Sequence, residues 1–112
     1  MCPINSPDSV IAQLTRADID KLPGSVVIEF GAGWCGYCKA ARPLILAALA
    51  DYPRVRHVMI EDGKGRRLGR TFAVKLWPTL IFLQDGQELG RLVRPDNMAE
   101  LSKLLAMLQD GD

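Results

Sequence analysis

The sequence of 112 residues has little cysteine, no excess of charge of either sign and no long apolar run. Its three cysteines are too few, and an odd number, for the disulfide framework of a small secreted module. With 14 basic against 13 acidic residues, the net charge of +1 argues against a nucleic-acid-binding protein, because such proteins are strongly basic. No window approaches the ~20 apolar residues of a transmembrane helix, so we expect no membrane partner.

The N-terminus lacks the signature of a secretory signal, because no basic segment followed by an apolar stretch comes after Met1. If Met1 is the native start, the expected compartment is the cytoplasm. Two prolines among polar residues predict a flexible arm over 1–8, and the remainder, 9–112, fits one domain. The apolar fraction of 48% is enough to build a core without a lattice of disulfides.

Hydrophobic periodicity predicts an α/β domain with the element order β-α-β-α-β-α-β-β-α. Apolar runs at 26–30, 55–60 and 79–83 have the pattern of strands buried on both faces, with Glu29 as the exception inside the first. Apolar residues at spacings of three and four predict long helices after Cys38 and after 95–97. The other expected elements are a strand at 10–14, helices near 15–22 and 68–73, a hairpin turn at 85–86 and an edge strand at 88–93. Such an order predicts a central sheet with parallel pairs and an antiparallel edge.

The segment that carries chemistry is Trp34-Cys35-Gly36-Tyr37-Cys38, which follows a predicted strand and opens a predicted helix. At a helix N-terminus, the dipole and the unpaired backbone N–H groups stabilise a negatively charged sulfur. The thiol pKa in such motifs falls from ~8.5 toward ~7 or below. We therefore expect Cys35 to be the exposed attacking thiolate. Cys38, one turn further, suits the buried resolving thiol, which attacks the mixed disulfide and releases the partner.

With these features, the chain resembles the thioredoxin family over about residues 9–109. The matching features are, in chain order, Glu29-Phe30 at a strand end, Ala32, the segment Trp34 to Lys39, Pro43, Trp77-Pro78-Thr79 and, more weakly, Asp85-Gly86. The resemblance implies a thioredoxin-like fold, in which helices flank a central mixed sheet. It also implies a thiol-disulfide oxidoreductase that reduces protein disulfides through its C-x-x-C motif. No metal and no cofactor are implied beyond the redox-active disulfide Cys35–Cys38.

The partners implied by the resemblance are disulfide-containing client proteins and an external electron donor, such as a thioredoxin reductase or glutathione; a monomer is expected. An oxidase or isomerase of protein disulfides is an alternative, because direction depends on reduction potential and compartment. A non-catalytic adaptor with the same fold is another. A metal site made of Cys2, Cys35, Cys38 and His57 has the ligand count of structural zinc, but its members come from scattered contexts.

The resemblance also assigns roles outside the two cysteines. It implies a cis peptide bond between Trp77 and Pro78, which brings the Trp77 backbone beside the dithiol, where an extended client segment can pair with it. Together with this pair, Trp34, Gly36 and Tyr37 would form the contact surface around the attacking sulfur. The alternative is that both tryptophans are core residues that flank the motifs.

Glu29 stands where the family usually has a buried Asp that accepts a proton through water beneath the second cysteine. We expect the same catalytic role for Glu29, the alternative being a partly exposed carboxylate paired with a base. His57 is expected to be a half-exposed strand residue, with an interaction with Glu29 as the alternative.

Two positions depart from the family pattern. Tyr37 replaces the common proline and predicts a more oxidising couple, and Arg94-Pro95 lies where a glycine usually borders the substrate face, so an altered docking groove is expected.

Overall fold

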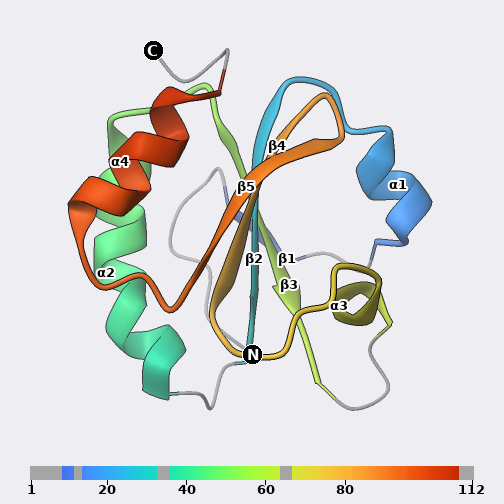
Figure 1. Ribbon diagram of the computed structural model, residues 1–112, viewed down its shortest axis with the longest axis horizontal. Helices are drawn as coiled ribbons and strands as arrows, with labels where there is room; N and C mark the ends of the chain where they lie inside the picture. Colours follow the sequence, from blue (N-terminus) through green and yellow to red (C-terminus); the bar gives the residue numbers. More distant parts are fainter. Residues whose placement is uncertain (1–8, 12–13, 33–35, 64–66, 109–112) are drawn as a thin grey trace.

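Five strands form one mixed sheet, with helices on both of its faces (Figure 1). The structure, a computed structural model, describes residues 9–11, 14–32, 36–63 and 67–108, so the arm predicted over 1–8 lies outside the described residues. The elements are β1 (Ser9–Ile11), α1 (Arg16–Asp20), β2 (Ser25–Gly31), α2 (Gly36–Ala50), β3 (Arg56–Glu61), α3 (Leu68–Thr71), β4 (Thr79–Gln84), β5 (Gln87–Val93) and α4 (Met98–Ala106). The predicted element order and fold class are confirmed.

The sheet has the order β1-β3-β2-β4-β5. Strand β3 pairs in parallel with β1 and β2, and β4 pairs antiparallel with β2 and β5. The parallel β2–β3 pair needs a crossover, which α2 supplies. Asp85 and Gly86 have φ values of 52° and 83°, as the two central residues of a type I′ hairpin turn require. The predicted hairpin is therefore confirmed.

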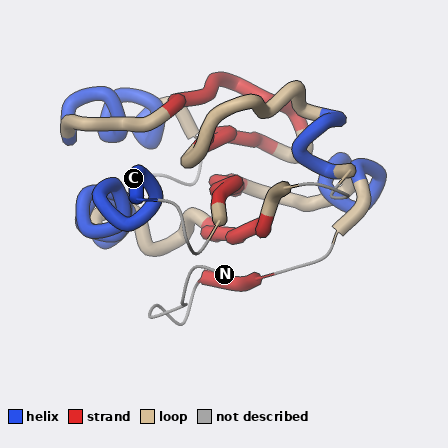
Figure 2. Tube along the Cα trace, turned by 90° about the horizontal axis from the view of Figure 1, so that it is seen from below, coloured by secondary structure: helices blue, strands red, loops and turns tan. Residues whose placement is uncertain are grey.

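Helices lie on both faces of the sheet (Figure 2), and an apolar layer lies on each face. All seven residues of β2 are buried, as a central strand covered on both faces requires. One layer contains residues of β2, β3 and β4 with α1 and α3: Ile19, Val26, Ile28, Phe30, Val58, Ile60, Leu68, Phe72, Ile81 and Leu83. The other contains residues of α2 and α4 against the sheet: Val27, Ala41, Ile45, Ala48, Val55, Leu80, Phe82, Leu101, Leu105 and Leu108. Successive β2 side chains alternate between the layers, so Glu29 faces the same side as Val27.

The turn before β2 and the turn after β4 lie at the same end of the β2–β4 pair and are joined by hydrogen bonds. The Gly24 N–H donates to the Asp85 side chain at 2.8 Å, and the Asp85 N–H donates to the Gly24 carbonyl at 2.9 Å. Gly86 lies so close to the Asp20 carbonyl at the end of α1 that a Cβ at this position would collide with it. The hairpin turn thus packs directly against the C-terminal end of α1.

Replacing Gly86 by Ala should lower the free energy of unfolding by about 2 kcal/mol or more, because a side chain at φ +83° is strained and collides with the Asp20 carbonyl. Chemical denaturation measures the loss. Gly36→Ala is the control: a Cβ there meets no described atom within 4 Å, so a change within about 0.5 kcal/mol is expected. Equal losses in the two variants would contradict this account.

Candidate active site

The candidate site lies at the edge of the sheet where β2 and β3 end and β4 begins, beside the start of α2 (Figure 1). Two predicted site residues, Trp34 and Cys35, lie outside the described residues. Helix α2 begins at the next residue, Gly36, so the second half of the C-x-x-C motif forms its first turn. Cys38 is 0% exposed, which agrees with the buried position expected for it.

Three elements meet at Cys38. Its side chain packs with Ala32, which follows β2, and with Met59 of β3, and the partly buried Trp77 covers this small cluster. Met59 is also the register partner of Glu29 across the β2–β3 pair. The fold therefore brings the predicted contact residue Trp77 to the second cysteine, although 39 positions separate them in the sequence.

Glu29 is 2% exposed and uses both carboxylate oxygens. Its Oε1 atom lies 2.7 Å from Nε2 of His57, and its Oε2 atom accepts a hydrogen bond from Nη2 of Arg42 at 3.3 Å. His57 is only 2% exposed, so the expectation of a half-exposed histidine was wrong and the alternative, an interaction with Glu29, is present. The physical reason is that α2 and the loop after it cover this face of β3, and the glutamate side chain is long enough to reach the histidine.

The partners of Glu29 follow from the cost of burying a charge. A buried carboxylate is tolerated only when an opposite charge and hydrogen bonds replace its lost water. Arg42 supplies the charge: it lies four residues after Cys38 and hence on the same face of α2. Arg42 was not predicted from the sequence, although its i, i+4 spacing from Cys38 was a usable signal. The carboxylate is consequently held beneath the helix that carries Cys38.

The loop before β4 contains the cis peptide bond between Trp77 and Pro78, as the resemblance implied. The indole Nε1–H of Trp77 donates to Oδ2 of Asp62 at 2.9 Å, and the Asp62 N–H donates to the Gly31 carbonyl at 2.8 Å. Asp62 thereby links the ends of β2 and β3 to this loop. It was not singled out from the sequence, where its position two residues after the predicted strand at 55–60 was the only signal.

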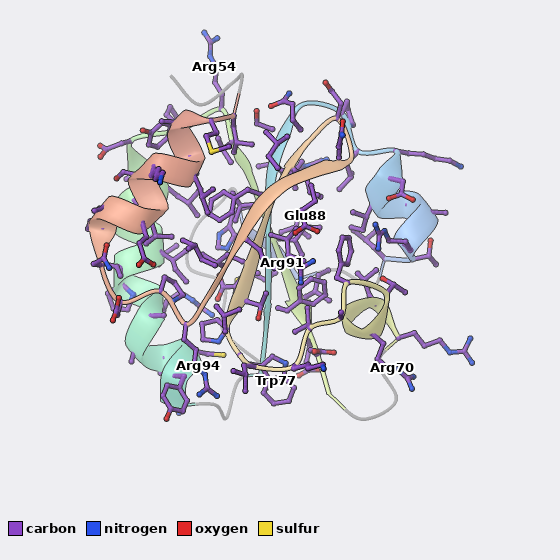
Figure 3. All side chains as sticks on the ribbon, viewed as in Figure 1. Arg54, Arg70, Trp77, Glu88, Arg91 and Arg94 are labelled. Atoms are coloured by element: carbon purple, nitrogen blue, oxygen red, sulfur yellow. The ribbon has the colours of Figure 1, made fainter. Side chains whose placement is uncertain are left out.

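Arg94, directly after β5, contacts both sides of the site. Its backbone N–H donates to the Pro78 carbonyl at 2.8 Å, and its side-chain Nε–H donates to the Trp77 carbonyl at 2.9 Å. The guanidinium carbon of Arg94, a residue labelled in Figure 3, lies over the Tyr37 ring. Its distance from the ring centroid is 3.7 Å, a cation–π contact. Tyr37 is 58% exposed, so this contact forms on the surface. A change in the groove near Arg94-Pro95 was expected from the sequence, but the contact with Tyr37 was not.

The metal hypothesis gains no support in the described part of the chain, where no cluster of three or more His, Cys, Asp or Glu side chains could hold an ion. Of its four proposed ligands, Cys2 and Cys35 lie outside the described residues, and His57 is hydrogen-bonded to Glu29. Among the helices described, none has both the length and the apolar character needed to cross a bilayer.

Comparison with known proteins points to the thioredoxin family, whose profile matches residues 11–107. The thioredoxin of Chlamydia trachomatis is 35% identical over 100 residues, which are 89% of this chain and 97% of that protein. Thioredoxin-2, mitochondrial, of Schizosaccharomyces pombe is 30% identical over 107 residues, covering 96% of this chain and 77% of the relative. The structure of thioredoxin 2 from Pseudomonas aeruginosa in its reduced form matches with a TM-score of 0.76 and 49% identity, covering 84% of this chain and 87% of that one.

A double-mutant cycle tests the buried pair. His57→Leu should lower the free energy of unfolding by about 2 kcal/mol, because Oε1 of Glu29 loses its 2.7 Å partner inside the protein. In a Glu29→Gln background the same replacement should cost less, giving a coupling free energy of about 1.5 kcal/mol or more by urea denaturation. Strictly additive losses would show that the two side chains do not stabilise one another.

Proposed function

Because the chain belongs to the thioredoxin family, whose members are protein-disulfide oxidoreductases, we propose that Cys35 and Cys38 are the two thiols with which it works. The chain is a thiol-disulfide oxidoreductase. The observation that best supports the assignment is the complete burial of Cys38 in the first turn of α2, directly after the position of Cys35 in the chain. A thiol at that depth cannot meet a client first, but it can displace one already bound to its neighbour.

In the proposed cycle, the Cys35 thiolate attacks one sulfur of a client disulfide, so that a bond between Cys35 and the client forms and the client S–S bond breaks. The released client sulfur leaves as a thiolate and takes a proton from solvent. Cys38 then loses its proton and attacks the sulfur of Cys35, which forms the Cys35–Cys38 disulfide and releases the second client thiolate. The client gains two electrons and two protons in total, and a reductase later returns them to the protein.

Glu29 takes the proton that Cys38 loses, through a water molecule. Two contacts support this role. Arg42, one turn after Cys38, donates to the carboxylate, and Met59, the register partner of Glu29, packs against Cys38. Both place the carboxylate beneath the same stretch of α2. His57 holds the other carboxylate oxygen and thereby fixes the side chain.

The client lies against Trp34, Gly36, Tyr37, Trp77 and Pro78. Support comes from the exposed ring of Tyr37 and from Trp77, which is only partly buried although it packs against the cluster around Cys38. A client segment in extended form pairs with the Trp77 backbone as an added strand, the usual way in which a short peptide gains main-chain hydrogen bonds.

Thioredoxins act on disulfide-containing substrates, are reduced by thioredoxin reductase and need no cofactor. For this chain we also propose net reduction of clients, glutathione as an alternative electron donor, and a monomer. The proposed compartment is the cytoplasm, although a relative bears the name of a mitochondrial protein. We further propose that 9–112 act as one domain, because a single sheet joins strands from Ser9 to Val93.

Replacing Cys38 by Ser should trap client proteins on Cys35, because the mixed disulfide then has no thiol to resolve it. Incubation with a disulfide-containing protein such as insulin, followed by non-reducing electrophoresis and mass spectrometry, measures the adduct. Cys35→Ser is the matched control, with Cys2→Ser added to both variants, and it should give far less adduct, since the remaining thiol, Cys38, is fully buried. Equal adduct in the two variants would overturn the assignment of attacking and resolving thiols.

Replacing Glu29 by Gln should slow the resolving step by about 100-fold at neutral pH, while the first attack by Cys35 keeps its rate. Single-turnover kinetics that follow the first and the second client thiol separately measure the two steps. Raising the pH should restore the second step, because solvent then deprotonates Cys38 directly.

Glu100→Gln, at an exposed position of α4, is the control and should change neither step. The unchanged first step in Glu29→Gln also shows that the variant is folded. Equal slowing of both steps, or a resolving step that keeps its rate, would remove Glu29 from the mechanism.

A further inference from the structure

Arg94 has a backbone conformation that its side chain disfavours. Its φ of 51° lies in the left-handed region, which residues other than glycine, asparagine and aspartate rarely adopt. Conformations of this kind persist only where the surrounding structure enforces them, and they cluster at functional sites. Here the backbone N–H is held by the Pro78 carbonyl at 2.8 Å, beside the cis peptide bond. The position of the residue is therefore fixed by the site itself.

The side chain of Arg94 bridges the two halves of the proposed client surface. One edge of the guanidinium donates from Nε to the Trp77 carbonyl, and its face lies 3.7 Å from the centre of the Tyr37 ring. Stacking and the Nε hydrogen bond together hold the planar group in one orientation. Lysine could not reproduce this geometry, because its ammonium group has no plane to stack and no second donor edge.

The guanidinium of Arg94 forms no ion pair with an acidic side chain in the described ranges, whereas Arg16, Arg42 and Arg91 each pair with a carboxylate. The Nε–H of Arg94 donates to the Trp77 carbonyl, so a ligand can bind the edge formed by the two terminal amino groups. Such an edge matches the two oxygens of a carboxylate. Arg94 is also only partly buried, so a client can reach it.

We propose that Arg94 is a specificity-determining residue, which favours client segments carrying a glutamate or aspartate beside the reacting cysteine; the proposal rests on the disulfide-exchange function above. A client strand pairing with the Trp77 backbone passes directly along the guanidinium. The Trp77 carbonyl has two lone pairs, so it can accept a client N–H while it keeps its bond to Arg94. The client main chain thus forms hydrogen bonds with the Trp77 backbone, and its acidic side chain forms an ion pair with Arg94.

The test uses two disulfide-linked peptides that differ only in one residue, glutamate or glutamine, next to the reacting cysteine. The dithiol form of the protein reduces each peptide under second-order conditions, and both rates are divided by those of dithiothreitol to remove the intrinsic effect of the glutamate. At low salt the corrected ratio of glutamate to glutamine rates should be about threefold to fivefold, in the range of a partly exposed ion pair. The ratio should fall toward one at about 0.5 M salt, because salt screens such pairs.

Arg94→Gly, which suits the observed φ, should bring the ratio to one. The ratio is the readout because it cancels any loss of rate common to both peptides. Arg54→Ala is the matched control: it removes the same charge from an exposed position at the opposite end of the molecule (Figure 3), and it should retain the preference.

The outcomes separate the two proposals. If the wild-type protein reduces both peptides at equal corrected rates, or if Arg94→Gly keeps the preference, the role of Arg94 is overturned and disulfide exchange stands. If Arg54→Ala loses the preference as fully as Arg94→Gly does, net charge rather than a local contact determines it, which also overturns the proposal. If neither peptide is reduced by a protein whose dithiol is intact, the proposed function fails and this inference fails with it.

Discussion

A carboxylate buried in a central strand needs a compensating charge, and this requirement joins the sheet to the helix that carries the second cysteine. Glu29 lies in β2, which is covered on both faces, so its carboxylate is separated from bulk water. Arg42 of α2 supplies the opposite charge, and His57 of β3 is hydrogen-bonded to the other carboxylate oxygen. Removing any one of the three would leave a polar group buried without its partner, so the arrangement fixes how α2 lies over the sheet.

The position of Cys38 follows from the same packing. Helix α2 contacts the sheet through residues at helical spacing, Cys38, Ala41, Ile45 and Ala48, and Arg42 flanks this stripe. The cysteine is the first residue of the stripe, where the helix meets the ends of β2 and β3. Its depth is thus a consequence of the helix packing and not of local chemistry. A thiol buried in this way is shielded from a client protein, as the proposed resolving role requires.

The fold was predictable because its signals are local. The hairpin turn at Asp85-Gly86 is specified by two adjacent residues of the sequence, and the structure has it. The burial of His57 was not predictable in this way, because it depends on the covering helix and on the reach of the Glu29 side chain across the sheet. The cis bond before Pro78 came from the family resemblance alone, since no local rule separates it from other X–Pro bonds.

The two departures from the family pattern, at Tyr37 and Arg94, are a single feature in space. A tyrosine in the motif offers an exposed aromatic face, and the arginine after β5 covers it with a cation. This cation lies over the residue two positions after Cys35, in the first turn of a helix whose dipole already favours a negative sulfur. We expect a positive charge at this position to stabilise a thiolate, and hence the reduced form, which would make the dithiol couple more oxidising. The absence of proline predicts a shift in the same direction, so we expect Arg94 and the composition of the motif to change the reduction potential in the same sense. Neither position can be interpreted without the other.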